Sequence, residues 1–162
     1  MRTIFVFISS IIFFLCSHAQ EFTLEVSVKG IKDIKGDLLI SLYNDPSSFP
    51  KAEGSLKKSM LNVKNNEESF LFQGLDQGSY AYAIFQDLNG NKILDADSNG
   101  IPLEPFTFSK DAMGKGRPPT WDEACIQLNN NTSESVKLKD LSKLRNLINK
   151  LQADDKKNKK GS

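Results

Sequence analysis

The feature that most constrains the fold is a run of residues, 78–87, that is apolar on both of its possible faces. Because side chains alternate along a strand, each face of this run carries three apolar side chains: Tyr80, Tyr82 and Ile84 on one, and Ala81, Ala83 and Phe85 on the other. A strand without a polar face must be covered on both sides. The run therefore predicts the central strand of a packed β structure.

Other strands are indicated by short alternating apolar segments that Gly, Pro and Asn separate. The expected strands are residues 21–29, 37–43, 56–63, 69–72, 78–87, 124–128 and 133–139, with a short strand at 106–108. The asparagines at 129–131 predict a hairpin turn between the last two strands. About seven short strands favour an all-β fold, an immunoglobulin-like or Greek-key β-sandwich.

The start of the central strand resembles a tyrosine corner. Gly78 precedes Tyr80 by two residues, and in such corners the tyrosine hydroxyl binds the backbone a few residues upstream. The alternative is a glycine turn followed by an ordinary core tyrosine. We favour the corner because the strand count already indicates a sandwich.

Residues 1–19 have the organisation of a secretory signal peptide, with Arg2, an apolar run at 4–15 and small residues up to Ala19. The apolar run is shorter than the roughly 20 residues that a membrane-spanning helix needs. Lipidation of Cys16 is the alternative, but bulky residues precede this cysteine at 13–15. We therefore predict cleavage after Ala19 and an exported protein, either periplasmic or extracellular.

Export would leave a chain with unusual limits on its chemistry. His18 is the only histidine, and without residues 1–19 Cys125 is the only cysteine, so an internal disulfide is excluded. Arg2 is the only charge lost, so 20 basic residues balance 20 acidic ones and give no overall attraction to nucleic acid or anionic lipid. Without histidine, a nucleophile elbow or a phosphate loop, we expect a protein that is not an enzyme.

Side-chain oxygens are concentrated directly after the central strand, in a loop at residues 87–97 that we call the polar loop. The spacing matches positions one, three, five, seven and nine of a calcium-binding loop, with Ile93 offering its carbonyl: Asp87, Asn89, Asn91, Ile93 and Asp95. Asp97 would replace the acid of position twelve, where the chain has Ser98, and Lys92 stands where such loops have Gly. The alternative is a turn in which Asp and Asn cap their own backbone. Calcium is thus the one cofactor that the sequence indicates.

The connection from residue 88 to residue 123 is long for a compact domain. Its apolar residues indicate an ordered segment that packs on the sandwich. Near its end, Arg117 and Trp121 belong to a Gly- and Pro-rich stretch, residues 114–121, that could contact a carbohydrate or peptide. The alternative is that Trp121 anchors the connection.

A helical period begins at Leu141 and predicts a short amphipathic helix at 141–152, followed by a disordered charged tail at 153–162. The helix could dock over an open end of the sandwich, or its apolar stripe could join two copies of the chain in a dimer.

Several motifs in order resemble domain-of-unknown-function family 2141. They are residues 78–85, 87–91, 94–95, 100–102, Glu104, 108–109, 116–119 and 122–124. The resemblance covers about residues 22–139 and implies a small exported bacterial β-sandwich protein, without implying an activity. Members of the family often have Gly where this chain has Lys92, and the C-terminal helix lies outside the resemblance.

The sequence thus predicts a signal peptide at 1–19, a β-sandwich domain at 20–140, a helix at 141–152 and a tail at 153–162. We expect a non-catalytic binding module for an unknown envelope or extracellular partner, stabilised by calcium. The alternative is a structural or assembly domain of the cell envelope whose helix recruits a partner. Neither function involves nucleic acid or a membrane-spanning segment.

Overall fold

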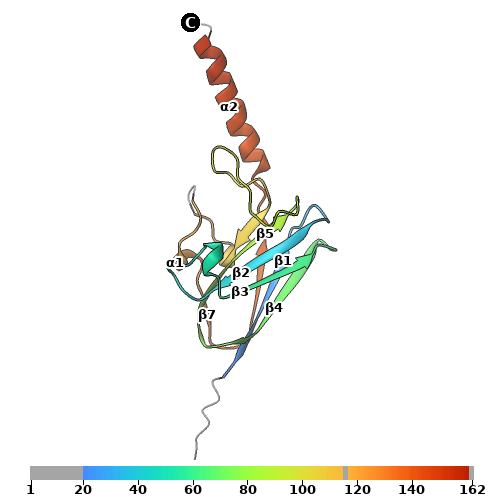
Figure 1. The fold of residues 1–162 in the computed structure, drawn as a ribbon, viewed down its shortest axis with the longest axis vertical. Helices are drawn as coiled ribbons and strands as arrows, with labels where there is room; N and C mark the ends of the chain where they lie inside the picture. The colour runs from blue at the N-terminus through green and yellow to red at the C-terminus, as the bar shows by residue number, and fades with distance from the viewer. Residues whose placement is uncertain (1–19, 115–116, 161–162) are drawn as a thin grey trace, which may run out of the picture.

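The computed structural model describes residues 20–114 and 117–160 and shows two packed sheets with a helix projecting from one end (Figure 1). The predicted signal peptide lies outside the described residues. The strands are β1 (Phe22–Lys29), β2 (Asp37–Tyr43), β3 (Lys57–Asn62), β4 (Glu67–Leu75), β5 (Gly78–Asp87), β6 (Phe106–Phe108), β7 (Ile126–Leu128) and β8 (Thr132–Lys137). The helices are α1 (Trp121–Ala124) and α2 (Ser142–Lys160), with 3-10 turns η1 (Ala52–Gly54) and η2 (Ser109–Asp111). The predicted all-β sandwich with a C-terminal helix is confirmed.

β5 pairs with three strands, more than any other strand of the described chain. One sheet has the order β4–β1–β8, and the other has the order β3–β2–β5–β6. One edge of β5 pairs with β2, while β6 and β7 pair with its residues 83–85 and 78–80. All of these pairs are antiparallel except that of β1 with β8. The central position predicted for residues 78–87 is thus confirmed.

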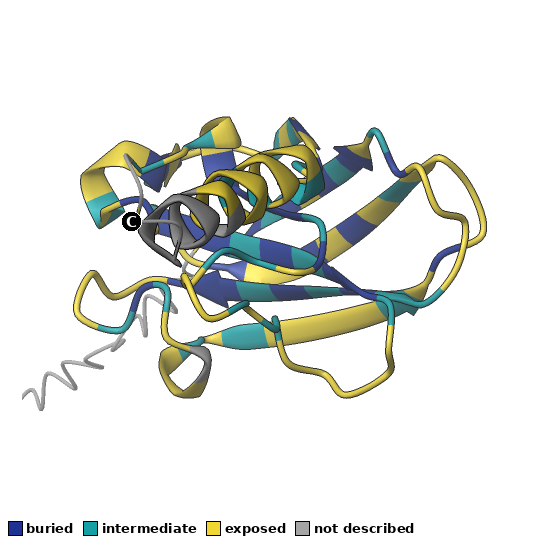
Figure 2. Ribbon diagram, turned by 90° about the horizontal axis from the view of Figure 1, so that it is seen from above, coloured by how far each residue is buried: buried dark blue, intermediate teal, exposed yellow. Residues whose placement is uncertain are grey.

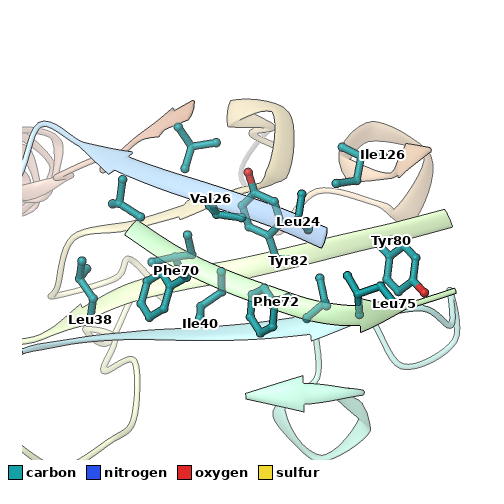
Figure 3. Close-up of a cluster of buried hydrophobic side chains, with 14 of the residues drawn as sticks. Leu24, Val26, Leu38, Ile40, Phe70, Phe72, Leu75, Tyr80, Tyr82 and Ile126 are labelled. Carbon is teal, nitrogen blue, oxygen red and sulfur yellow. The ribbon is translucent and has the colours of Figure 1, made fainter. Parts of the chain in front are cut away.

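The main core lies between the two sheets (Figure 3). Burial alternates along β1 as its sequence predicts. The core side chains that Figure 3 labels come from both sheets: Leu24, Val26, Leu38, Ile40, Phe70, Phe72, Leu75, Tyr80, Tyr82 and Ile126. Removing a Leu or Phe side chain of this size from water stabilises the fold by roughly 1.5–3 kcal/mol.

A second apolar cluster covers the opposite face of β5. Its buried members are Tyr43, Phe49, Ala81, Phe106, Phe108 and Ala124. The Phe49 ring packs edge-on against Tyr43, Phe108 and Trp121, with centroid distances of 5.3, 6.0 and 6.0 Å. The long connection therefore folds over the outer face of the sheet, and β5 is covered on both faces.

The tyrosine corner is confirmed. The Tyr80 hydroxyl donates a hydrogen bond of 2.9 Å to the carbonyl oxygen of Asp76. This bond spans the turn at which the chain leaves β4 in one sheet and enters β5 in the other. It therefore fixes a crossing between the sheets.

The predicted hairpin between the last two strands is wrong. β7 pairs with β5 in one sheet, whereas β8 pairs with β1 in the other, so the turn at 129–131 carries the chain across the sandwich. The side chain of Asn131 accepts a hydrogen bond of 3.0 Å from the Thr23 amide, which fixes the entry of β8 beside β1. Leu128 and Val136 both reach the core, but from opposite sheets.

α2 stands clear of the sandwich along most of its length (Figure 1). Its contacts with the turn at residues 99–102 reach from its base to its middle: Arg145 donates to the Pro102 carbonyl (3.1 Å) and Gln152 donates to Asn99 (3.1 Å). The helix continues to Lys160, beyond the predicted end at residue 152. No helix in the described part of the chain is long and apolar enough to cross a membrane.

Replacing Tyr80 with Phe tests the corner. The change keeps the ring and removes only the hydrogen bond to Asp76, so we expect the free energy of unfolding to fall by about 1 kcal/mol. Urea denaturation measures this loss, with an unchanged denaturant slope as the sign that the fold is retained. An unchanged midpoint would show that the bond does not stabilise the crossing.

Candidate functional site

The polar loop begins where the second sheet ends. Asp87 is the last residue of β5, pairs with Asp37 of β2 and is 1% exposed. Gly36 has φ of +70°, and a Cβ on it would lie 2.1 Å from the Asp87 carbonyl oxygen. Only glycine fits so close to this backbone. The start of the polar loop is therefore held by packing against the turn before β2.

Asp87 shapes the loop through its carboxylate. Its Oδ1 accepts a hydrogen bond from the Gly90 amide (2.7 Å), and its Oδ2 accepts one from the Lys92 amide (2.8 Å). Burial acts to raise the pKa of Asp87, but the amides of Lys92, Gly90, Asn89 and Asn91 lower it below the ordinary aspartate value. The ionised carboxylate therefore holds the curl of the loop.

The side chains of Asn89, Asn91 and Asp95 converge. Both asparagines donate from Nδ2 to the same oxygen, Oδ2 of Asp95, each at 2.7 Å. The Oδ1 of Asn89 accepts from the Asn91 amide, and the Oδ1 of Asn91 accepts from the Ile93 amide. Three of the predicted metal ligands thus meet in one place, in a pattern that also satisfies the loop backbone.

Lys92 adopts the backbone conformation of the glycine that it replaces. Its φ is +61°, in the left-handed region that Gly adopts easily and other residues adopt only at a cost of about 1 kcal/mol or more. The substitution of Lys at position six therefore does not prevent the loop from curling. The Lys92 side chain is exposed.

Asp97 and Ile93 do not join this cluster through their side chains. The Oδ1 of Asp97 accepts from the amides of Asn99 and Ile101, within the turn that follows. Its Oδ2 is buried and has no hydrogen-bond partner among the described residues. The side chain of Ile93 is 62% exposed, as suits a residue predicted to use only its carbonyl.

Glu104 belongs to the site although the spacing argument did not include it. It is 5% exposed, and its Oε1 accepts from the Leu88 amide (2.9 Å) while its Oε2 lies 3.4 Å from the Asp95 amide. It therefore joins both ends of the polar loop. The sequence signal was a single acid in an otherwise apolar stretch, residues 101–106.

The side chains of this site offer oxygen atoms, which are hard ligands. Within 20–114 and 117–160, no three Asp, Glu, His or Cys side chains form a group that could hold a metal. A cation at the polar loop would therefore depend on amide and carbonyl oxygens as well as on Asp95. Such mixed oxygen sets suit Ca²⁺ better than transition metals.

The second predicted site, Arg117 and Trp121, makes well-defined contacts within the protein. Arg117 donates to both carboxylate oxygens of Glu123, at 2.9 and 3.1 Å. These bonds, together with one from the Thr120 amide, lower the pKa of Glu123 to about 2. Thr120 and Glu123 form a capping box at the start of α1. Trp121 packs on Phe49, as the anchoring alternative expects. The exposed surface of Arg117 is the part available to a ligand.

The fold and the loop together define a β-sandwich with a polar loop at the end of its central strand. Residues 26–136 match the family model described as "Uncharacterized protein conserved in bacteria" (DUF2141). The chain belongs to this family, as its motifs indicated. Neither the curated proteins nor the solved structures that we searched gave a match.

Asp87 should contribute to the acid sensitivity of the domain. Because its folded pKa is lowered, its ionised form adds stability above the ordinary aspartate pKa of about 3.9, and this stability is lost as the pH falls through the folded value. Asp87→Asn should reduce the free energy of unfolding at pH 7 and flatten its decline below about pH 4.

Urea denaturation at a series of pH values measures this effect. Asp154→Asn is the control, because Asp154 is an exposed carboxylate on α2. Equal pH profiles for the wild type and Asp87→Asn would contradict the role assigned to Asp87.

Proposed function

We propose that the protein is an exported, non-catalytic binding module whose polar loop binds calcium. The observation that carries the proposal is the convergence of Asn89 and Asn91 on one carboxylate oxygen of Asp95. The left-handed conformation of Lys92 supports it, since alternate side chains meet only in a tightly curled loop.

The residues present fit calcium by their donor chemistry. Asp95 would supply a carboxylate, Asn89 and Asn91 their amide oxygens, and Ile93 its carbonyl. The amide oxygen and nitrogen of Asn exchange places when the group rotates by about 180°, so each asparagine can present either atom to the cluster. Such a rotation removes a hydrogen bond to the loop backbone, which favours weak binding with a Kd of about 10⁻⁴ to 10⁻³ M.

In this proposal Asp87 and Glu104 organise the loop. Both are buried, and both accept hydrogen bonds from loop amides. Bound calcium would fix the long connection, which covers the outer face of β5 and carries Arg117 and Trp121 toward its end. These two residues are the ones that we propose for contact with a carbohydrate or peptide.

The sequence and the surroundings of Cys125 support a non-catalytic function. A chain cleaved after Ala19 has no histidine. The Cys125 sulfur lies 3.8 Å from the Ile126 carbonyl oxygen and 3.7 Å from the Gln127 side-chain nitrogen, neither of which is a base. Activation of a cysteine as a nucleophile uses an adjacent general base, and neither of these two atoms can act as one.

Thermal unfolding in EDTA and in 10 mM calcium tests the calcium proposal. This calcium concentration is about ten times the weakest Kd expected, about 10⁻³ M. At ten times the Kd, binding adds about 1.4 kcal/mol, which should raise the Tm by about 4–8 °C in a domain of this size. Asp95→Asn should abolish the rise.

Asp45→Asn is the matched control for this experiment. Asp45 also caps a turn, accepting from the amide and hydroxyl of Ser47, but it lies outside the polar loop. Its variant should retain the full calcium shift. A Tm that calcium leaves unchanged in the wild type, or a shift that Asp95→Asn retains, would reject the polar loop as a calcium site.

Export makes a separate prediction. Expression of the full chain in a bacterial host, followed by fractionation and N-terminal sequencing, should give a periplasmic or secreted protein that begins at Gln20. An intact N-terminus in the cytoplasm would contradict export, and a mature N-terminus at Cys16 would indicate lipidation.

A further inference from the structure

We propose that α2 binds an anionic lipid surface and lies flat in its headgroup region. The helix projects from the sandwich in Figure 1, and most of its residues that are coloured in Figure 2 are exposed. This inference concerns a surface separate from the polar loop and does not depend on calcium. It rests on an apolar stripe, on the charge beside this stripe, and on the attachment of the helix to the body.

The apolar stripe consists of Leu144, Leu147 and Leu151. Their exposed fractions are 47, 54 and 57%, so about half of each leucine is in contact with solvent. Ile148, which is half-buried, extends the stripe toward the body. Spacings of three and four residues place these side chains on one face of a helix. The described residues of the sandwich leave this face uncovered.

The attachment of α2 turns the stripe away from the sandwich. Arg145 and Gln152 hold the helix to the turn at residues 99–102. Leu144 directly precedes Arg145, and Leu151 directly precedes Gln152. Successive residues of a helix are rotated by about 100° around its axis. The leucines therefore lie on a face adjacent to the anchored one, where a flat surface can reach them.

Basic residues border the stripe on its other side. Lys143 and Lys150 precede Leu144 and Leu151 by one residue, and both lysines are exposed. The sequence of α2 contains seven basic and two acidic residues, a net charge of +5, whereas the rest of the chain from residue 20 on has 13 basic and 18 acidic residues, a net charge of −5. A basic helix with a leucine face is the pattern of helices that lie on anionic membranes.

The positive charge and short stripe of α2 argue against two other partners, a second copy of the chain and nucleic acid. In a dimer formed through α2, two helices of +5 would face each other over a stripe of about two turns, shorter than the three or four heptads typical of a coiled coil. Nucleic acid would use the lysines but leave the leucines in water, since its backbone is bound through charge. An anionic lipid surface satisfies both the leucines and the lysines.

Vesicle co-sedimentation tests the proposal on residues 20–162, whose core begins at Phe22. The chain should bind vesicles containing a quarter phosphatidylglycerol in 50 mM salt and EDTA, and should not bind pure phosphatidylcholine. The double variant Leu147→Ser/Leu151→Ser should weaken binding more than tenfold. Lys143→Gln/Lys150→Gln should weaken it about 25-fold, at roughly fivefold for each lysine near the surface.

Matched controls come from the sandwich. Lys58→Gln/Lys64→Gln removes the same charge, and Met60→Ser/Leu71→Ser replaces two exposed apolar side chains, so both should bind as the wild type does. Wild-type protein that remains in the supernatant overturns the proposal. Binding that survives the leucine variant also overturns it, because charge alone would then explain the attraction. A leucine-dependent dimer in light scattering would assign the stripe to a second copy.

Discussion

The structure depends on the burial of β5 on both faces. Tyr80, Tyr82 and Ile84 enter the core between the sheets, while Ala81 lies in the second apolar cluster. A sheet that faced water on one side would leave this second face exposed, so the chain needs a further layer. The long connection supplies it, and Phe49 packs edge-on against Phe108 and Trp121 to hold that layer in place.

The same constraint positions the polar loop. Because β5 is held along both edges and both faces, Asp87 is delivered to a fixed point at the end of the sheet, beside Gly36. Its buried carboxylate then orders the amides that follow, and Glu104 joins the two ends of the loop. A rigid strand end keeps the backbone of the polar loop in place, which would lower the entropic cost of the binding that we propose there. The helix at the same end of the molecule is held less closely, through Arg145 and Gln152 in its first eleven residues.

Errors in the sequence-based prediction occurred where local patterns did not determine the spatial partner. The turn at 129–131 permits a chain reversal, but only the packing of Leu128 and Val136 in opposite sheets makes it a crossing. Thr120 and Glu123 carry the spacing of a capping box, so the helix at Trp121 was available to sequence reasoning and was missed. Glu104 was not recognised as part of the site because it lies nine residues beyond Asp95, and no periodic pattern links them.

The sequence by itself determined the strands, the central place of β5, the tyrosine corner and the family, because each of these follows from alternation and from motifs of a few residues. It also determined which oxygens lie close to one another in the polar loop, since short spacings limit where they can point. Tertiary structure alone decided which sheet each late strand joins and that Glu104 closes the loop. These features depend on contacts between residues distant along the chain, and such contacts are set by which apolar surfaces can be buried together.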